Sequence, residues 1–145
     1  MCVLKVSVHW KNDFQFTAED LEGHSVEINA TQIDGKIRGI TPMQLLLIAL
    51  GGCTAIDVVQ ILQKQRQEFT ALTIDVSGDR RAEEPRYFEK IHVKYALMGR
   101  DLDEVKIQRA IRLSKEKYCS VEAMLKSKAD ITSTYVILKE PHENP

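Results

Sequence analysis

One long apolar segment in the middle of the chain constrains its fold more than any other feature. It begins at Pro42 and runs PMQLLLIALGGCTAIDVVQILQKQR. Thr41 and Pro42 are typical of a helix start, and only the Gly51-Gly52 pair interrupts the helical pattern. Apolar residues occupy nearly every side of this helix, so it must be covered all round. We therefore expect a central buried helix over residues 42–67.

A membrane-spanning helix is the alternative interpretation of this segment. Its apolar stretch from Leu45 to Val59 has 15 residues and contains Asp57, whereas about 20 residues are needed to cross a bilayer. The chain starts MCVLKVSVHW, which lacks the basic and then apolar pattern of a secretory signal. We expect no membrane partner and a cytoplasmic location, where cysteines are usually free, catalytic or metal-bound.

Strand patterns flank the helix on both sides. Alternating apolar and polar residues predict a three-stranded antiparallel meander within residues 1–30. Residues 31–41 carry two glycines and no clear period, so we expect a loop there. After the helix, alternations that start at Leu72 and Ile91 predict a hairpin around the charged connection GDRRAEEPR.

A second, amphipathic helix should follow the hairpin. Asp101 with Glu104 three residues later matches a capping box, and an apolar stripe continues through positions 107, 110, 111 and 114. The helix should end near Cys119, where Ser120 can cap a further short helix before a final strand over residues 131–138. Strands that are grouped, and do not alternate strictly with helices, favour an α+β fold.

Length and charge limit the domain count and the partners. A chain of 145 residues fits a single domain over residues 1–145, with a hairpin, helix and final strand occupying residues 70–138. Its 20 basic and 21 acidic residues provide no excess positive charge for nucleic acid. Six short strands cannot cover an all-apolar helix on every side, so we predict a homodimer in which a second copy supplies the missing cover.

Three cysteines are the residues of greatest chemical interest. Cys53 follows the two glycines of the apolar helix and is either a small core residue or a thiol with one open side. Cys119 precedes a predicted helix start, where the dipole would favour a thiolate, or it fills a half-buried junction. The 66 residues between the two numbers exclude a CxxC pair and a compact zinc knuckle. We interpret Cys2, near the terminus, as a bystander.

Three segments together resemble a known family. TPMQLLLIALGGCTAIDVV, PRYFEKIHVKY and AIRLSKEKYCSVEAML are similar to the OsmC/Ohr family of osmotically induced and organic hydroperoxide resistance proteins, and closest to the OsmC-like subgroup with GGC and KYCS patterns. The resemblance implies antiparallel strands packed on a central helix within an intertwined homodimer. It also implies a thiol peroxidase that reduces organic hydroperoxides, and hydrogen peroxide to varying degrees, with no metal or organic cofactor.

The resemblance assigns roles to two of the cysteines. Cys53 would be the nucleophile that attacks the peroxide and becomes a sulfenic acid. Cys119 would resolve it to a disulfide within the same subunit, which a small dithiol or a lipoyl-bearing protein then reduces.

The histidines form no HExxH or Cys/His cluster, so we expect no metal site.

A cation that favours the thiolate is harder to assign. In the hydroperoxide resistance proteins an arginine does this, held by a glutamate that follows the proline of the cysteine helix. Met43 occupies that position here and Gln44 follows it. Arg38 is our candidate cation, with a solvated loop charge as its alternative and Arg86 as a weaker candidate. Asp57 lies on the same helix face as Cys53, where it would oppose a thiolate or anchor an arginine.

The departure from the glutamate pattern keeps a second function open. A dimeric module of the same fold could sense redox state or bind a small molecule without efficient peroxide reduction. A third possibility, a purely structural interaction protein, leaves the two thiols without a role.

Overall fold

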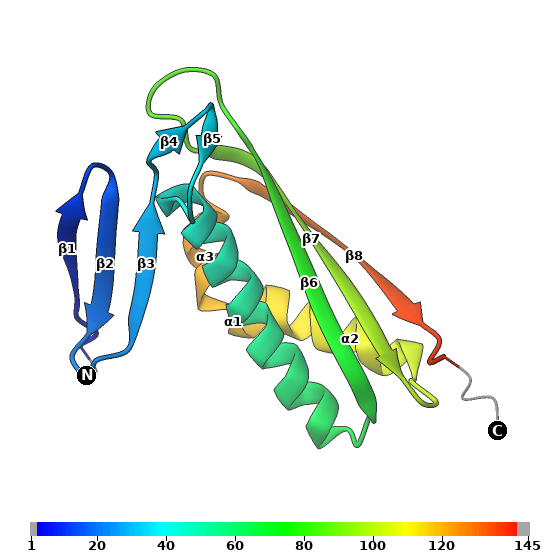
Figure 1. The fold of residues 1–145 in the computed structure, drawn as a ribbon. Coiled ribbons are helices and arrows are strands. Elements are labelled where there is room, and N and C mark those ends of the chain that lie inside the picture. The colour runs from blue at the N-terminus through cyan, green and yellow to red at the C-terminus, as the bar shows by residue number, and fades with distance from the viewer. Residues whose placement is uncertain (1–2, 142–145) are drawn as a thin grey trace. The chain divides into compact units, whose positions relative to one another are not determined.

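The computed structural model describes residues 3–141, so Cys2 lies outside the described residues. The chain forms two compact units, one ending at Leu46 and one beginning at Leu47 (Figure 1). Helix α1 (Pro42–Lys64) starts in the first unit and continues through the second.

The N-terminal unit contains the expected meander. Strands β1 (Val6–Asn12), β2 (Gln15–Asp20) and β3 (Ser25–Asn29) pair antiparallel in that order, as their alternating pattern predicted. The order confirms the prediction for residues 1–30.

The segment predicted as a loop holds a small hairpin. Strands β4 (Gln32–Ile33) and β5 (Lys36–Ile37) pair antiparallel across Asp34 and Gly35. These two turn residues have φ of 52° and 73°, the left-handed conformation that an Asp-Gly hairpin turn requires. The prediction of a plain loop over 31–41 was wrong because the strands are only two residues long and show no periodicity.

The C-terminal unit is built on a three-stranded sheet in the order β6-β7-β8. Strand β6 (Phe69–Arg80) pairs antiparallel with β7 (Phe88–Gly99), which confirms the predicted hairpin. Strand β8 (Asp130–Leu138), the predicted final strand, pairs parallel with β7, a direction that the sequence did not indicate. A parallel neighbour needs a crossover, and the helical segment between β7 and β8 provides it.

The crossover contains three helical pieces: α2 (Glu104–Leu113), the π-helix η1 (Ser114–Tyr118) and α3 (Ser120–Leu125). The N-cap of α2 is Asp103, whose Oδ1 accepts the amides of Val105 and Lys106. Asp101, the predicted cap, lies two residues earlier with φ of 50°. Cys119 is the N-cap of α3, and Ser120, the predicted cap, is the first helical residue.

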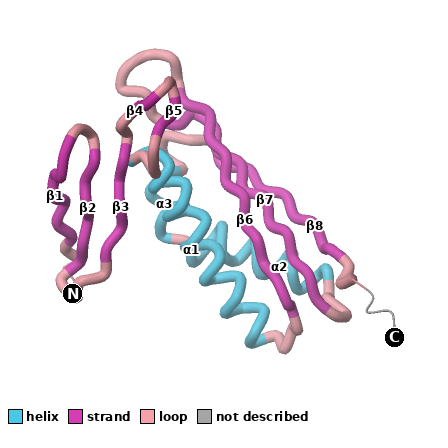
Figure 2. Tube along the Cα trace, in the orientation of Figure 1, coloured by secondary structure: helices cyan, strands magenta, loops and turns pink. Residues whose placement is uncertain are grey.

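The helices cover one face of this sheet (Figure 2). Along β7 the residues that point to that face are buried and their neighbours are more exposed, which is the pattern of a half-covered strand. The predicted stripe of α2 is also buried, which places the core between this helix, α1 and the sheet. The fully or almost fully buried positions are Leu50, Val58, Leu62, Ile91, Val93, Tyr95, Leu97, Ile107 and Ala110.

Helix α1 is only partly covered within one chain. Its buried residues recur every four positions, at Leu50, Thr54, Val58 and Leu62. The apolar side chains of Ile48 and Ile56 are 54% and 62% exposed. Burial on every side is therefore not reached in one subunit. By length and composition alone α1 could cross a membrane: its most apolar 18 residues have a mean hydropathy of 2.1, and 28% of these residues are buried.

Candidate functional site

The two thiols predicted to work together are close in space. Cys53 lies in the middle of α1 and is partly exposed, whereas Cys119 is 4% exposed at the junction of η1 and α3. Both are free thiols, and the two sulfur atoms and a carboxylate oxygen of Asp57 lie within 4.8 Å of one another. The fold thus assembles a dithiol with one acidic neighbour.

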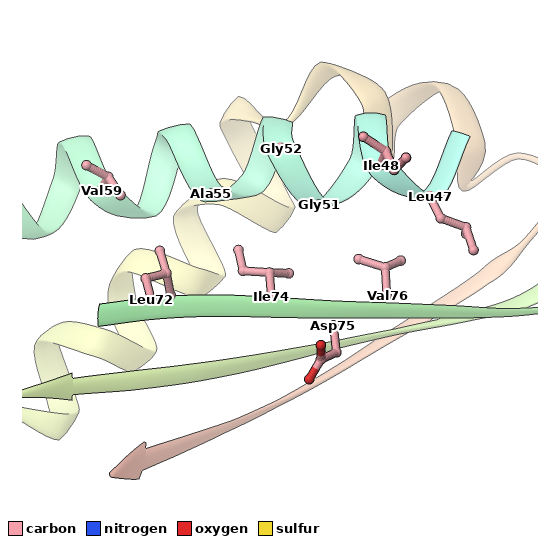
Figure 3. Close-up of a pocket in the computed structure, with 10 residues that line it drawn as sticks. All are labelled: Leu47, Ile48, Gly51, Gly52, Ala55, Val59, Leu72, Ile74, Asp75 and Val76. Carbon is pink, nitrogen blue, oxygen red and sulfur yellow. The ribbon is translucent and has the colours of Figure 1, made fainter. Parts of the chain in front are cut away.

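Close packing of α1 on the sheet positions Cys53. Gly51 faces β6, and a Cβ atom at this position would lie 3.1 Å from Cγ2 of Val76. Figure 3 shows Gly51 of the helix above Ile74 and Val76 of the strand. Nothing lies within 4 Å of a Cβ built at Gly52. The first glycine therefore lets the helix approach the strand, and the second lies on an open part of the helix surface.

The π-helical turn positions Cys119. Its amide donates to the carbonyl of Ser114 at 2.8 Å, which closes the wide turn. The backbone then becomes extended, and the Cys119 sulfur accepts the amide of Glu122 at 3.4 Å as the cap of α3. The side chain is in this way held over the first turn of the short helix, with its sulfur beside Cys53.

A chain of buried hydroxyl groups ends at Asp57. The Ser114 hydroxyl donates to Oδ2 of Asp57 at 2.9 Å. The Thr54 hydroxyl lies 2.8 Å from that of Ser114 and 2.7 Å from that of Tyr95. Since Ser114 uses its proton on the carboxylate, it must accept from Thr54, which in turn accepts from Tyr95. This directional chain fixes the carboxylate beside the sulfurs.

Burial controls the electrostatics of Cys119. Desolvation raises the pKa of this thiol to about 12, and the Glu122 amide opposes the shift only in part. The neighbouring Cys53 and Glu122 raise the pKa of Cys119 further, and burial also raises the pKa of the Glu122 carboxyl. Of the two alternatives for Cys119, a thiolate at a helix start or a cysteine buried at a junction, the structure favours the second, because desolvation outweighs the effect of a six-residue helix.

Both candidate cations, Arg38 and Arg86, are exposed. Arg38 is exposed in the N-terminal unit, where its amide donates to the carbonyl of Thr31. Arg86 is exposed in the β6–β7 connection, and its Nε donates to the carbonyl of Arg81. Among residues 3–141 no basic side chain forms an ion pair with Asp57.

Gln44, next to the position of the family's glutamate, has a structural role. Its Oε1 accepts the amide of Thr41 at 2.9 Å and the Thr41 hydroxyl at 3.1 Å. The Thr41 hydroxyl in turn accepts the amide of Gln44, so the pair forms a capping box at the start of α1. Gln44 thus serves the helix terminus.

Helix α1 lines two cavities, of which the smaller includes Asp57. An apolar groove of about 690 Å³ runs between α1 and β6, over the residues drawn in Figure 3. A smaller pocket of about 310 Å³ opens beside Asp57, between α1 and the α2–η1 segment. It is lined by polar and apolar side chains: Gln60, Ile61, Lys64, Gln65, Arg109, Leu113 and Tyr118. The second pocket gives small solutes access to the carboxylate side of the dithiol.

Sequence reasoning missed four residues of this site. Ser114 was assigned only to the apolar stripe, although a serine in such a stripe needs a buried partner. Thr54, Tyr95 and Glu122 carried no signal, because their roles depend on contacts between α1, β7 and the crossover.

Cys53 on α1 and Cys119 at the η1–α3 junction thus form a pair of neighbouring free thiols within a mixed α+β fold. The chain belongs to the OsmC-like protein family, whose sequence model matches residues 33–134. It is 38% identical to protein YhfA of Escherichia coli K12 over 135 residues, which cover 93% of this chain and 98% of that protein.

Solved structures agree with the fold. A hypothetical protein from Aquifex aeolicus VF5 has a TM-score of 0.84 and 34% identity, covering 97% of this chain and all of its own. The organic hydroperoxide resistance protein OhrB of Bacillus subtilis has a TM-score of 0.63 and 17% identity, covering 93% of this chain and 98% of its own. The second likeness, at that identity, is one of fold. The family model and the solved structures together assign the chain to the OsmC-like fold.

Proposed function

We propose that this protein is a thiol peroxidase that reduces organic hydroperoxides. The observation that carries the proposal is the proximity of the Cys53 and Cys119 sulfurs, within 4.8 Å. The more exposed Cys53 is the nucleophile, and the buried Cys119 is the resolving thiol.

The proposed reaction has three steps: peroxide attack, disulfide formation and reduction of the disulfide. The Cys53 thiolate attacks the terminal peroxide oxygen, the O–O bond breaks, and the departing alkoxide takes a proton to leave as an alcohol. The sulfur is now a sulfenic acid. Cys119 condenses with it, forming the S–S bond and releasing water. An external dithiol, either small or carried by a lipoyl protein, then reduces the disulfide and becomes a disulfide itself.

The thiol ionisation of this reaction needs a cation near Cys53, and we assign that role to Arg38. The assignment is a prediction from the sequence. Asp57 cannot provide the charge, since a carboxylate beside a thiolate opposes it. The Arg38→Ala variant should therefore consume peroxide more slowly than the native protein.

The working unit is a cytoplasmic homodimer in this proposal. The support is the exposed apolar surface of α1, including Ile48 and Ile56, which a second copy would remove from water. Sedimentation at micromolar concentration should give a species of twice the chain mass, and a monomer would count against this part.

Stopped-flow consumption of cumene hydroperoxide with a dithiol reductant tests the activity. The native protein and Cys2→Ser should turn over, Cys53→Ser should not, and Cys119→Ser should accumulate a long-lived sulfenic acid. A native rate no faster than that of Cys53→Ser would refute the peroxidase. Unchanged turnover in Cys119→Ser would refute the resolving role.

A non-catalytic redox sensor of the same fold is the second candidate function. The high pKa of Cys119 favours it, because a thiol that stays protonated at neutral pH condenses slowly. Slow condensation limits an enzyme in every cycle, whereas a sensor needs the disulfide only once. A sensor would form the Cys53–Cys119 disulfide with peroxide once and would show no sustained turnover with excess dithiol.

A further inference from the structure

We propose that Cys53, Cys119 and Asp57 form a binding site for a thiolate-preferring divalent cation, with Zn²⁺ as the best match. Their two sulfurs and one carboxylate oxygen lie within 4.8 Å of one another. In a tetrahedral zinc site, bonds of about 2.3 Å to sulfur place two sulfurs about 3.8 Å apart. The three side chains therefore need only small rotations to close around one ion.

The carboxylate is arranged as a metal ligand would be. Asp57 is partly buried, and among the residues that the structure describes no basic side chain forms an ion pair with it, although Lys64 and Arg109 line the same pocket. The Ser114 hydroxyl donates to one of its oxygens, and the other can face the sulfurs. Ligating carboxylates in metalloproteins are characteristically held by such an outer hydrogen bond. A cation bound at this point would supply a positive partner for the carboxylate.

The two sulfurs are also presented from rigid elements. Cys53 lies one helical turn before Asp57 on α1, which puts both on one face of the helix. Cys119 enters from the crossover, and the Glu122 amide donates to its sulfur. An amide that donates to a sulfur stabilises the thiolate that a metal requires.

The donor set selects the metal. Two thiolates with one carboxylate suit the borderline Zn²⁺ ion, whereas Mg²⁺ and Ca²⁺ take oxygen ligands only. Three protein ligands leave a fourth tetrahedral position for water, which the pocket of about 310 Å³ beside Asp57 can supply. Binding forms two Zn–S bonds and one Zn–O bond, and the two thiols release their protons to solvent.

Metal binding and disulfide formation exclude each other at this site, since both use the same sulfurs. The site was not predictable from spacing, because the 66 residues between the cysteines match no zinc motif. The proposal does not depend on the peroxidase activity, and its tests contain no peroxide.

X-ray absorption at the zinc edge tests the ligand set in the native protein. Reduced, metal-free protein loaded with one equivalent of Zn²⁺ without oxygen should show two sulfur and two oxygen ligands. A shell with fewer than two sulfurs, or one without oxygen, would overturn the proposal. This measurement requires no substitution, so it is independent of whether any variant folds.

Titration of reduced protein with Cd²⁺ tests the residues, followed by the ultraviolet charge-transfer absorption of cadmium thiolate. The native protein should saturate at one ion per chain, and so should Cys2→Ser. Cys53→Ser and Cys119→Ser should each lose at least half of the absorption. Saturation above one ion per chain, or loss of binding in Cys2→Ser, would contradict the assignment.

Competition for Zn²⁺ with a chromogenic chelator tests the carboxylate. Asp57→Asn and Ser114→Ala should each weaken binding on the order of 10- to 100-fold, while circular dichroism stays native. The control is Asp75→Asn, an exposed aspartate of β6 in the same unit, which should change nothing. Unchanged affinity in Asp57→Asn would remove the carboxylate from the site and refute the three-ligand proposal.

Discussion

Oxidation of the Cys53–Cys119 pair should stabilise the protein by a large and measurable amount. A disulfide here would close a loop of about 66 residues between α1 and the crossover, the difference of the two residue numbers. Cross-linking removes loop-closure entropy from the unfolded chain, and for a loop of this length the chain-entropy relation gives about 4 kcal/mol at 25 °C. The gain is an upper value, since any distortion of the buried Cys119 reduces it.

The thermal midpoint should rise accordingly. For a chain of nearly this size each 1 kcal/mol shifts the midpoint by about 2 to 4 °C, so 4 kcal/mol corresponds to about 8 to 16 °C. The assay is circular dichroism melting of the same sample after diamide oxidation and after reduction with a phosphine. Protein concentration must be held constant, because association shifts the midpoint by mass action.

Three variants separate the disulfide from other effects of oxidation. Cys2→Ser should keep the full difference between the oxidised and reduced samples, whereas Cys53→Ser and Cys119→Ser should abolish it. Equal midpoints for oxidised and reduced native protein, in a sample shown by mass spectrometry to hold the disulfide, would refute the entropy reasoning. A lower oxidised midpoint would mean that strain exceeds the entropic gain.

Three further predictions concern Thr54, Tyr95 and the two glycines of α1. Thr54→Val removes the hydroxyl that joins two others in the core, so urea unfolding should show a loss of about 1 to 3 kcal/mol, whereas Thr54→Ser should keep most of the stability. Burial raises the pKa of Tyr95 from 10.0 to about 12, so the folded protein keeps this proton where the unfolded chain loses it, and stability should fall as pH rises from about 10 to about 12. Tyr95→Phe should flatten that part of the urea-unfolding pH profile, and an unchanged slope would contradict the assignment. Gly52→Ala has open space for its methyl group and should gain up to about 1 kcal/mol from helix propensity, while Gly51→Ala should gain less because of its 3.1 Å approach to Val76.

Periodicity in the sequence predicted the regular elements well. The meander, the apolar helix, the β6–β7 hairpin and the final strand all follow from local alternation or helical spacing. Helix ends were harder, because Asp101 and Asp103 are both good capping residues and only backbone geometry selects the second. The direction of β8 could not be predicted either, since alternation is the same in parallel and antiparallel strands.

The candidate site was predicted by resemblance and completed by the fold. Cys53 and Cys119 were identified as a pair, but their proximity depends on how the crossover returns over α1. Asp57 was placed on the Cys53 face from the four-residue spacing, which the cluster confirms. The sequence left open whether Cys119 is a thiolate at a helix start or a cysteine buried at a junction, because it indicates the helix start but not the depth of burial that decides the matter. The single-domain interpretation and the roles of Arg38 and the second subunit stay predictions.

The wide turn η1 makes the cysteine pair sensitive to the length of the chain between Leu113 and Cys119. A π-helix accommodates one residue more per turn than an α-helix. Removing one residue from 115–117 would take out the extra residue of this wide turn, so the segment would reach Cys119 along a different path from Leu113. The buried stripe of α2 would be untouched, yet the Cys119 sulfur would no longer point at Cys53. A single-codon deletion could thus separate the folded structure from its thiol chemistry, and two relatives that both contain these cysteines can differ in whether they ever meet.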